Sequence, residues 1–310
     1  MKDPSTDFRL LMISAMYENG GNTTHRFLDG HPQMFAYPFE SQLGTRLVSD
    51  HLASTFPVKY RWPVFALDAT PADDYRAIID EEGKVRARTP DVSKFRHMPF
   101  DLSDDERQQI YEREIARSGR SRANNVAAFF RATREAWKDS RSPAKPSVYV
   151  GYSPIIVVDA DKILTDLPTS HVLHVVRNPW SAYADTKKRP VPLSVRSYML
   201  GWTLNQYHAL LFQRRFPDRM HIVRAEDVMA DAKAALGPIL RKLGLDVADS
   251  LRAPSWNGTE LQEVYPWGTI RKANPAANRA TAEELSRAER EEVRALTWQY
   301  LDVFDYGSFL

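Results

Sequence analysis

The sequence predicts an α/β protein with a mostly parallel central sheet flanked by helices. Four short apolar segments, at residues 9–16, 147–152, 171–176 and 220–223, indicate buried strands. The segments between them have helical composition, and helical crossovers are the connections that parallel strands require. The 310 residues, 43% of them hydrophobic, contain no low-complexity linker, so we expect a single domain over residues 1–310.

Residues 45–146 depart most from this alternation of strands and helices. The segment is charged, contains prolines and is compatible with helices, for example in the amphipathic stretch from Asn125 to Trp137. We expect a mainly helical insertion that covers the sheet; a lid that shapes an acceptor site is a second interpretation. Further helices are expected at residues 194–216 and from Thr281 to Leu301, with Thr281 as the N-cap.

The composition excludes several classes of function. The chain has no cysteine, which rules out disulfides, thiolate nucleophiles and cysteine-ligated metals. Among the eight histidines only His171 and His174 have a spacing that would suit ligands, and they alternate with apolar residues and are interpreted as sheet residues, so no metal site is predicted. The 42 basic and 40 acidic side chains nearly balance, which argues against a nucleic-acid partner. The apolar run near the N-terminus is too short to span a membrane and lacks a cleavage-site pattern, so we expect a cytoplasmic protein.

The first strand leads into a turn with two glycines, Gly20 and Gly21, and a helix is expected to begin near Thr23. Such a turn directs backbone N–H groups and threonine hydroxyls at one point, where the helix dipole adds partial positive charge. A phosphate is the natural ligand of this arrangement, although an ordinary strand-to-helix connection shows the same pattern. The turn lacks the Gly-Lys-Ser/Thr end that holds magnesium and the terminal phosphates of a nucleoside triphosphate, which disfavours ATP and GTP chemistry.

This turn and the His31-Pro32 pair that follows resemble the sulfotransferase family, whose members transfer a sulfuryl group from 3′-phosphoadenosine-5′-phosphosulfate (PAPS). The resemblance implies a P-loop-like sulfotransferase fold and a turn that binds the 5′-phosphosulfate. The matching residues are Gly20, Gly21, Asn22, Thr23 and Thr24. The family has a lysine or arginine where this chain has Gly20, so another cation must offset the charge that develops during transfer. His25 and Arg26 are the nearest candidates.

Glu40 is the predicted catalytic base. It follows an apolar segment just after the His-Pro pair, which places it near the carboxyl edge of the sheet, where open α/β folds bind ligands. In glycan-modifying members of the family, a catalytic glutamate lies at a similar distance after this pair. The resemblance therefore implies that Glu40 accepts the proton of the acceptor hydroxyl. A surface glutamate is the alternative interpretation.

Arg177 ends the predicted strand at residues 171–176 and begins an Arg-Asn-Pro segment that resembles the family's 3′-phosphate motif. A guanidinium fixed at a strand end is suited to fork two hydrogen bonds to a phosphate, while a structural salt bridge is the alternative role. The family has a serine eight residues later, where this chain has Asp185. Ser181 or Thr186 would then have to supply the hydroxyl.

Two later segments also resemble family motifs. Glu226 and Asp227 follow the last predicted strand and are interpreted as structural residues. Residues 267–272 resemble a late basic loop that closes over the 3′-phosphate, which implies phosphate contacts for Arg271 and Lys272. A solvated basic pair is the alternative there.

Together these motifs imply an enzyme that transfers the sulfuryl group of PAPS to a small-molecule or glycan acceptor and releases 3′-phosphoadenosine-5′-phosphate (PAP), without a metal. The sequence does not separate a phenol, a sugar hydroxyl and a lipid hydroxyl, nor does it indicate an oligomeric state. A small-molecule or nucleotide kinase is one alternative, but it requires magnesium and a lysine in the turn. A catalytically inert nucleotide-binding protein is the other, and it would fit Gly20 and Asp185 in place of the family's basic residue and serine.

Overall fold

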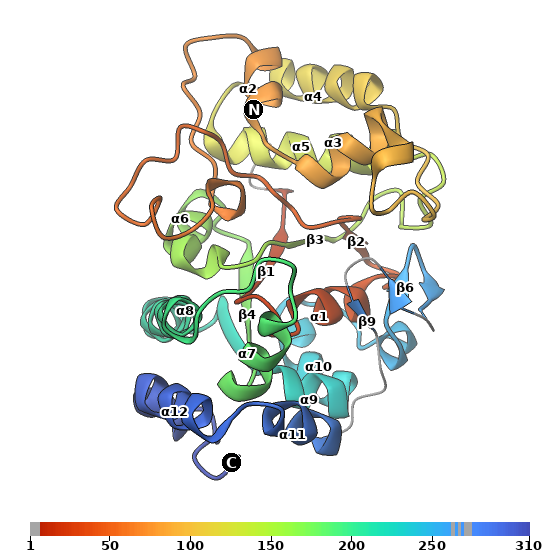
Figure 1. Cartoon of the computed structure of the whole chain (residues 1–310). Helices are drawn as coiled ribbons and strands as arrows, with labels where there is room; N and C mark the ends of the chain where they lie inside the picture. The colour runs from red at the N-terminus through yellow and green to blue at the C-terminus, as the bar shows by residue number, and fades with distance from the viewer. Residues whose placement is uncertain (1–6, 262–263, 266–267, 270–274) are drawn as a thin grey trace.

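The computed structural model describes residues 7–261, 264–265, 268–269 and 275–310. Five strands form one sheet in the order β2-β3-β1-β4-β5, and each neighbouring pair is parallel (Figure 1). The strands are β1 (Leu10–Ala15), β2 (Met34–Ala36), β3 (Val148–Tyr152), β4 (His171–Val176) and β5 (Met220–Arg224). The predicted α/β class and the four predicted strands are confirmed, and the short edge strand β2 is an addition.

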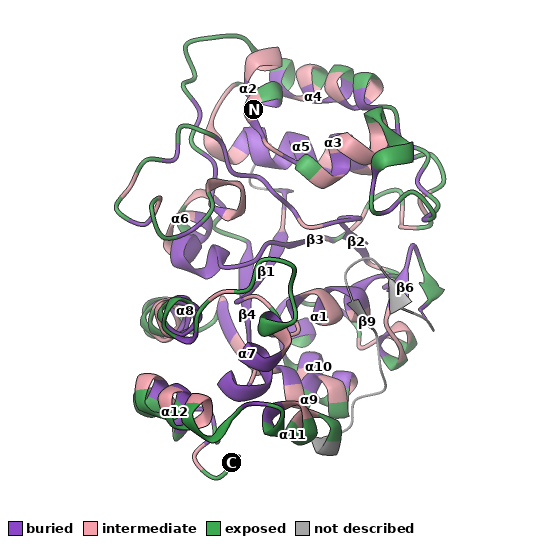
Figure 2. Ribbon diagram, in the orientation of Figure 1, coloured by how far each residue is buried: buried purple, intermediate pink, exposed green. Residues whose placement is uncertain are grey.

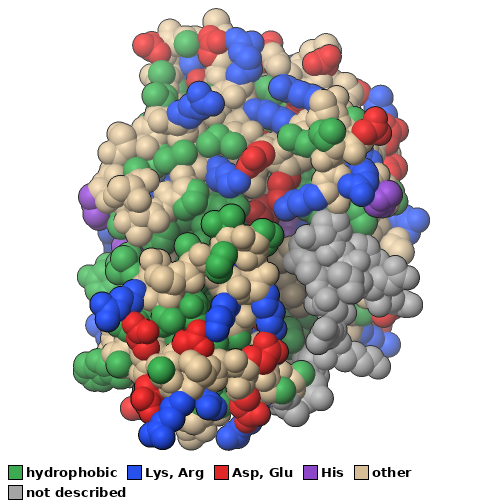
Figure 3. Space-filling view, in the orientation of Figure 1, with side chains coloured by type: hydrophobic (Ala, Val, Ile, Leu, Met, Phe, Trp, Pro, Cys, Tyr) green, Lys and Arg blue, Asp and Glu red, His purple; other side chains and the backbone are tan. Residues whose placement is uncertain are grey.

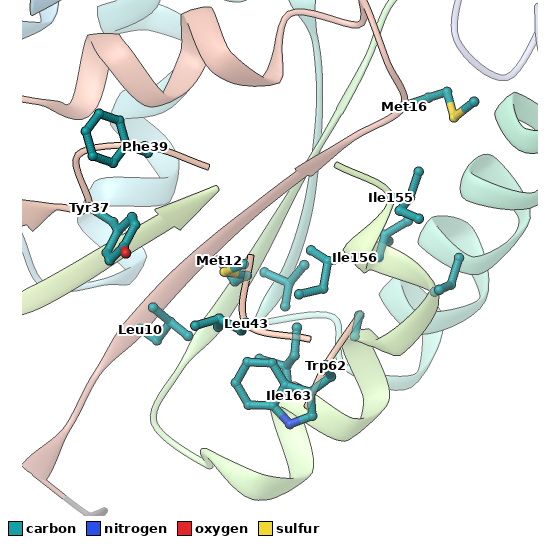
Figure 4. Packing of buried hydrophobic residues seen from close by; sticks show 14 of the residues in the cluster. Leu10, Met12, Met16, Tyr37, Phe39, Leu43, Trp62, Ile155, Ile156 and Ile163 are labelled. Atoms are coloured by element: carbon teal, nitrogen blue, oxygen red, sulfur yellow. The ribbon is translucent and has the colours of Figure 1, made fainter. Parts of the chain in front are cut away.

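Helices cover both faces of the sheet because successive side chains of its strands point in opposite directions. Leu10 and Met12 of β1 face one cluster of buried side chains, which includes Trp62, Ile156 and Ile163 (Figure 4). Neighbouring residues of β1 belong to a second cluster on the other face, beneath α1 (Gly21–Leu28), α9 (Ala225–Ala230) and α10 (Ala232–Lys242). β1 and β4 are therefore buried along their whole length (Figure 2).

The helices that follow β3 and β4 complete the layers. They are α6 (Ala160–Asp166), α7 (Pro179–Lys187) and α8 (Val195–Arg215). α8 is capped by the side chain of Ser194, which confirms the helix predicted at residues 194–216. Within the part of the chain that the structure describes, no helix is long and apolar enough to cross a membrane.

Residues 45–146 contain helices α2 to α5 and lie above the sheet in Figure 1. These helices are α2 (Pro71–Ala77), α3 (Glu81–Arg88), α4 (Asp104–Ser118) and α5 (Arg122–Ala136). The wholly buried guanidinium of Arg107 pairs with Asp104 on its own helix and, at 2.9 Å, with Asp80 before α3. These buried ion pairs of Arg107 connect the start of α3 to α4.

Arg61 holds the irregular segment that precedes α2. Its guanidinium is wholly buried and lies 2.7 Å from both Asp159, which is also wholly buried, and Asp50. The pairing anchors the short 3-10 turn η2 (Val58–Tyr60), which immediately precedes Arg61, against the segment that follows β3. Tyr60 is thereby held near the residues that follow β2.

Replacing Arg61 with alanine is expected to lower the free energy of unfolding by about 3 kcal/mol or more, because Asp159 would keep a buried charge with only Lys162 to pair it. Urea denaturation followed by circular dichroism would measure the change. Arg113→Ala is the matched control, since it removes an exposed pair to Glu135 and should cost less than about 1 kcal/mol. Equal, small losses in the two variants would contradict the structural role of Arg61.

The C-terminal region contains two helices where one was predicted. They are α11 (Pro275–Glu283) and α12 (Arg287–Leu301). Ser286 caps α12 in a capping box with Glu289, whereas Thr281 lies inside α11 and donates its hydroxyl to the carbonyl of Ala277 at 2.9 Å. The prediction of Thr281 as an N-cap was therefore wrong, because the Ser-x-x-Glu signal further along the chain is the stronger start.

Candidate active site

The glycine turn joins β1 to α1 at the carboxyl edge of the sheet. Gly20 has a φ of 79°, and a Cβ at Gly21 would lie 2.5 Å from the ring of Tyr152 and 2.7 Å from the Cβ of Ala15. The first intrahelical hydrogen bond runs from the amide of Thr24 to the carbonyl of Gly20 at 2.9 Å. The amides before Thr24 therefore have no partner inside the helix and point out of its N-terminus.

The side chains of this first turn differ in accessibility. Asn22 and Thr23 are half-buried. Thr24 is buried, and its hydroxyl donates to the carbonyl of Gly20 at 3.0 Å. Thr23 therefore offers its hydroxyl to a ligand, whereas Thr24 serves the turn itself.

Glu40 lies four residues after β2 and beside the glycine turn. Burial is the main cause that raises the pKa of Glu40 to about 7, and the neighbouring Glu82 carboxylate adds to it. The amide of Glu40 donates to Glu82 at 3.3 Å, and the Tyr60 hydroxyl bonds to the Glu40 carboxyl. Within the described residues, no group of three or more His, Asp or Glu side chains is placed to hold a metal ion.

Tyrosine rings connect Glu40 to the glycine turn. The rings of Tyr60 and Tyr17 lie 6.1 Å apart, and Tyr17 belongs to the turn. The Glu40 carboxyl acts electrostatically on Tyr17 and on Tyr152, the residue that packs against Gly21. The predicted base and the predicted phosphate cradle thus share one site.

Arg177 lies beside the same turn because β1 and β4 are adjacent parallel strands. Its amide donates to the Asn19 side chain at 2.9 Å, and its Nη1 donates to the Glu18 carbonyl at 2.9 Å and to Asp185 at 2.8 Å. Nε and Nη2 both donate to Oδ1 of Asn278, at 3.0 and 2.7 Å. The Arg177 guanidinium is therefore held in place from three sides, with Asp185 as its charge partner.

The two hydroxyls predicted to replace the family serine both donate to backbone carbonyls. Thr186 is wholly buried and donates to the carbonyl of Ala182 at 2.9 Å. Ser181 is also buried and donates to the carbonyl of Asn278 at 2.6 Å. Both hydroxyls are used by the fold, so Thr186 is not retained as a phosphate ligand.

His25 and Arg26, the cations predicted to replace the family's basic residue, point into the interior. Both side chains are buried, and burial lowers the pKa of His25 well below its usual value. The Arg26 guanidinium donates to the Tyr37 carbonyl at 3.2 Å and lies over the ring of Trp256 at 5.2 Å. Neither side chain reaches the mouth of the glycine turn, because α1 turns this face towards the sheet.

Another cation near the turn, Arg189, was not predicted from the sequence. It is exposed after the end of α7, and its guanidinium lies 4.9 Å from the centre of the Tyr17 ring. Burial raises the pKa of Tyr17 to about 12, and Arg189 opposes this effect. A second cation, Lys94, acts on Glu40 and pairs with Glu82. Nothing in the local sequence marks either residue, since each comes to the site from a distant segment.

Glu226 has the structural role that the sequence predicted. Its carboxylate accepts from the amide and side chain of Asn178 at 3.1 and 2.9 Å, from Asn278 at 3.0 Å and from the Tyr306 hydroxyl at 2.7 Å. This network ties the start of α7 to α11. The two residues Arg271 and Lys272 lie outside the described residues, and their predicted phosphate contacts stay predictions.

A parallel sheet, a glycine turn that opens the first helix and an arginine at the end of the neighbouring strand together define a P-loop-like α/β protein. The model of the sulfotransferase family matches residues 20–249, which is most of the chain. The protein therefore belongs to the sulfotransferase family, and it is a transferase enzyme.

Two solved structures share this fold over nearly the whole chain. The sulfotransferase domain of the olefin synthase from Synechococcus PCC 7002 is 17% identical, with a TM-score of 0.55, and 97% of each chain is covered. A sulfotransferase domain from the curacin biosynthetic pathway is 14% identical, with a TM-score of 0.51 over 94% of this chain and 97% of the other. No curated protein matches the sequence. At such low identities, the likeness establishes the fold.

Proposed function

We propose that this sulfotransferase takes its sulfuryl group from PAPS and transfers it to an acceptor hydroxyl, with Glu40 as the general base. The observation that carries the proposal is the Glu40 carboxyl, whose pKa is raised to about 7 beside the glycine turn. A general base is most effective when its pKa lies near the working pH. A carboxyl with an unshifted pKa would hold the acceptor proton less well at neutral pH.

The start of α1 supplies the donors for the 5′-phosphosulfate. The amides of Gly21, Asn22 and Thr23 point out of the helix N-terminus, and the Thr23 hydroxyl adds a further donor. A Cβ at Gly21 would clash with Tyr152 and Ala15, so glycine allows α1 to begin close against β1 and β3. These donors match the charge and the hydrogen-bonding capacity of a phosphosulfate.

Arg177 is the proposed ligand of the 3′-phosphate. It follows β4 directly and lies next to the glycine turn. One nucleotide could therefore place its 5′-phosphosulfate at the turn and its 3′-phosphate at Arg177. Asn278 orients the guanidinium through Nε and Nη2, so Nη1 is the atom that a phosphate would take over from Asp185. Binding therefore exchanges one anionic partner of Arg177 for another.

The transfer step follows from these positions. Glu40 takes the proton of the acceptor hydroxyl as its oxygen forms a bond to sulfur. The bond between sulfur and the bridging oxygen of the phosphosulfate breaks, and PAP leaves with the bonding electrons. The helix amides and a cation near the turn offset the negative charge that grows on the leaving phosphate.

We assign that cation to Arg189, whose guanidinium lies 4.9 Å from the centre of the Tyr17 ring in the turn. Replacing Arg189 with alanine is expected to lower kcat about tenfold to a hundredfold and to leave PAP affinity nearly unchanged, because the charge grows mainly in the transition state. Arg196→Ala, which removes an exposed arginine on α8, is the control. A rise in KM without a fall in kcat would instead give Arg189 a role in binding only.

The experiment that tests the proposed function is calorimetric titration with PAP, with ADP and ATP plus magnesium as controls, followed by a sulfuryl-transfer assay with PAPS. Selective binding of PAP and transfer from PAPS support the proposal. Preference for ATP with magnesium would favour the kinase hypothesis. PAP binding without transfer to any hydroxyl would favour an inert nucleotide-binding protein, for which the pairing of Asp185 with Arg177 is the main support.

A further inference from the structure

A cavity of about 650 Å³ opens in the insertion, between α2, α3 and the segment that follows Glu40. Four of the residues that line it are cationic, and none of the described lining residues is acidic. The cations are Arg46, Arg76, Lys84 and Arg88. Between them the lining is mostly aliphatic, and Figure 3 shows Lys and Arg side chains among hydrophobic ones over α3 and its surroundings.

The four cations differ in their ion pairs within the part of the chain that the structure describes. Arg76 pairs with Asp73 at 2.5 Å, and Arg88 pairs with Asp104. Arg46 and Lys84, by contrast, form no ion pair among the residues that the structure describes. The Asp80 and Asp104 carboxylates raise the pKa of Lys84 electrostatically and so compensate part of its charge, which leaves Arg46 as the cation of the lining without an acidic partner among the described residues.

Lys84 lines the cavity, and hydrogen bonds to backbone carbonyls at the end of α2 hold its ammonium group in place. Its Nζ donates to the carbonyl of Ile78 and, at 3.3 Å, to that of Tyr75. Burial lowers the pKa of Lys84 to about 8, and an anion in the cavity would favour the charged ammonium. The guanidinium of Arg46 is exposed and is able to form the forked hydrogen bonds that carboxylates and phosphates accept.

One wall of the cavity is hydrogen-bonded to the segment that follows Glu40. The amides of Ile79 and Asp80 donate to the carbonyls of Gly44 and Gln42, at 3.1 and 2.8 Å, so one wall of the cavity is tied to the segment that begins at Glu40. A second hollow, of about 510 Å³, shares Arg46 and Ile79 with the first and is also lined by Lys59 and its ion-pair partner Glu81. Lys59 acts electrostatically on Glu40. Arg46 is six residues from Glu40, so the two lie within about 21 Å of each other.

We infer that this cationic cavity binds an anionic group of the acceptor, a carboxylate or a phosphate, and so directs the acceptor's hydroxyl to Glu40. The inference rests on the proposed function, because it assigns the acceptor that Glu40 deprotonates. Aliphatic lining between the cations suits the carbon chain that would join the anion to the hydroxyl. Arg46 and Lys84 are then specificity-determining residues, and Glu40 remains the catalytic one.

The test compares matched acceptors in the full-length protein with PAPS. The probes are ω-hydroxy fatty acids, the corresponding ω-hydroxyalkyl phosphates and the neutral α,ω-diols of equal chain length. The anionic probes should show a kcat/KM at least about tenfold above that of the diols, as expected for one charge-assisted contact. Arg46→Ala should remove this preference through KM, with little change in kcat or in turnover of the diols.

Arg113→Ala removes another exposed arginine of the insertion and should leave the preference intact. Calorimetric titration of the anionic probes into the complex with PAP gives a readout that does not need turnover, and Arg46→Ala should weaken this binding. Equal use of acids and diols, or binding that does not depend on Arg46, would overturn the inference while PAP binding still upholds the donor site. Failure to bind PAP would instead remove the proposed function itself. A preference for carboxylates over phosphates, or the reverse, identifies the anionic group.

Discussion

Replacing Glu40 with glutamine is expected to lower kcat for sulfuryl transfer by about 10²- to 10⁴-fold, the usual contribution of a general base. Glutamine keeps the size of the side chain but cannot accept the acceptor proton. In the wild type, the rate should rise with pH through a limb near the pKa of Glu40, about 7, because the ionised carboxylate is the active form. The variant should lack this limb. Transfer from PAPS, measured as a function of pH, checks both statements.

Stability provides an independent readout of the same substitution. Because burial raises the pKa of Glu40, the folded state binds its proton more tightly than the unfolded state does, and stability falls as pH rises from about 5 to 7. Glutamine carries no charge, so the variant should melt at a higher temperature than the wild type at pH 8, and the difference should shrink at pH 5. Glu135→Gln, at an exposed glutamate, is the control. An unchanged rate, or a variant that is less stable at pH 8, would contradict the role of Glu40.

Replacing Arg177 with alanine is expected to weaken PAP binding about tenfold to a hundredfold, since it removes charge-assisted hydrogen bonds to the 3′-phosphate. Replacing Asp185 with serine should act in the opposite direction. The carboxylate lies 2.8 Å from Nη1 of Arg177, so a phosphate has to displace it and then lie close to a like charge. Its removal should tighten PAP binding about tenfold. Calorimetric titration measures both effects.

Adenosine monophosphate, which has no 3′-phosphate, is the control ligand, and both substitutions should leave its affinity nearly unchanged. Asp185→Asn separates charge from hydrogen bonding, because it removes the charge without adding the family's hydroxyl. If Asp185→Ser and Asp185→Asn both fail to alter PAP affinity while Arg177→Ala weakens it, Asp185 has no influence on the 3′-phosphate site. Equal weakening of PAP and adenosine monophosphate by Arg177→Ala would show that Arg177 acts on the fold and not on the phosphate.

The sheet could be predicted because its strands are buried on both faces and so appear as continuous apolar runs. β2 was not predicted, because a strand of three residues is too short to show a recognisable hydrophobic pattern. The break between α11 and α12 could have been predicted from Ser286 and Glu289, because a capping box is a local sequence signal for the start of a helix. The sheet is thus marked by the burial of its strands, whereas the break between the two helices is marked by local hydrogen bonding.

The sequence by itself determined the parallel α/β fold, the glycine turn and the positions of Glu40 and Arg177 next to strand ends, because each depends on residues that are near neighbours in the chain. Only the tertiary structure decided which charges meet there. It turned His25 and Arg26 inward, since one face of α1 packs against the sheet, and it brought Arg189 to the turn from the far end of α7. It also raised the pKa of Glu40 and paired Asp185 with Arg177. Burial and electrostatic interactions depend on distances in space, and those distances arise only when remote segments pack together.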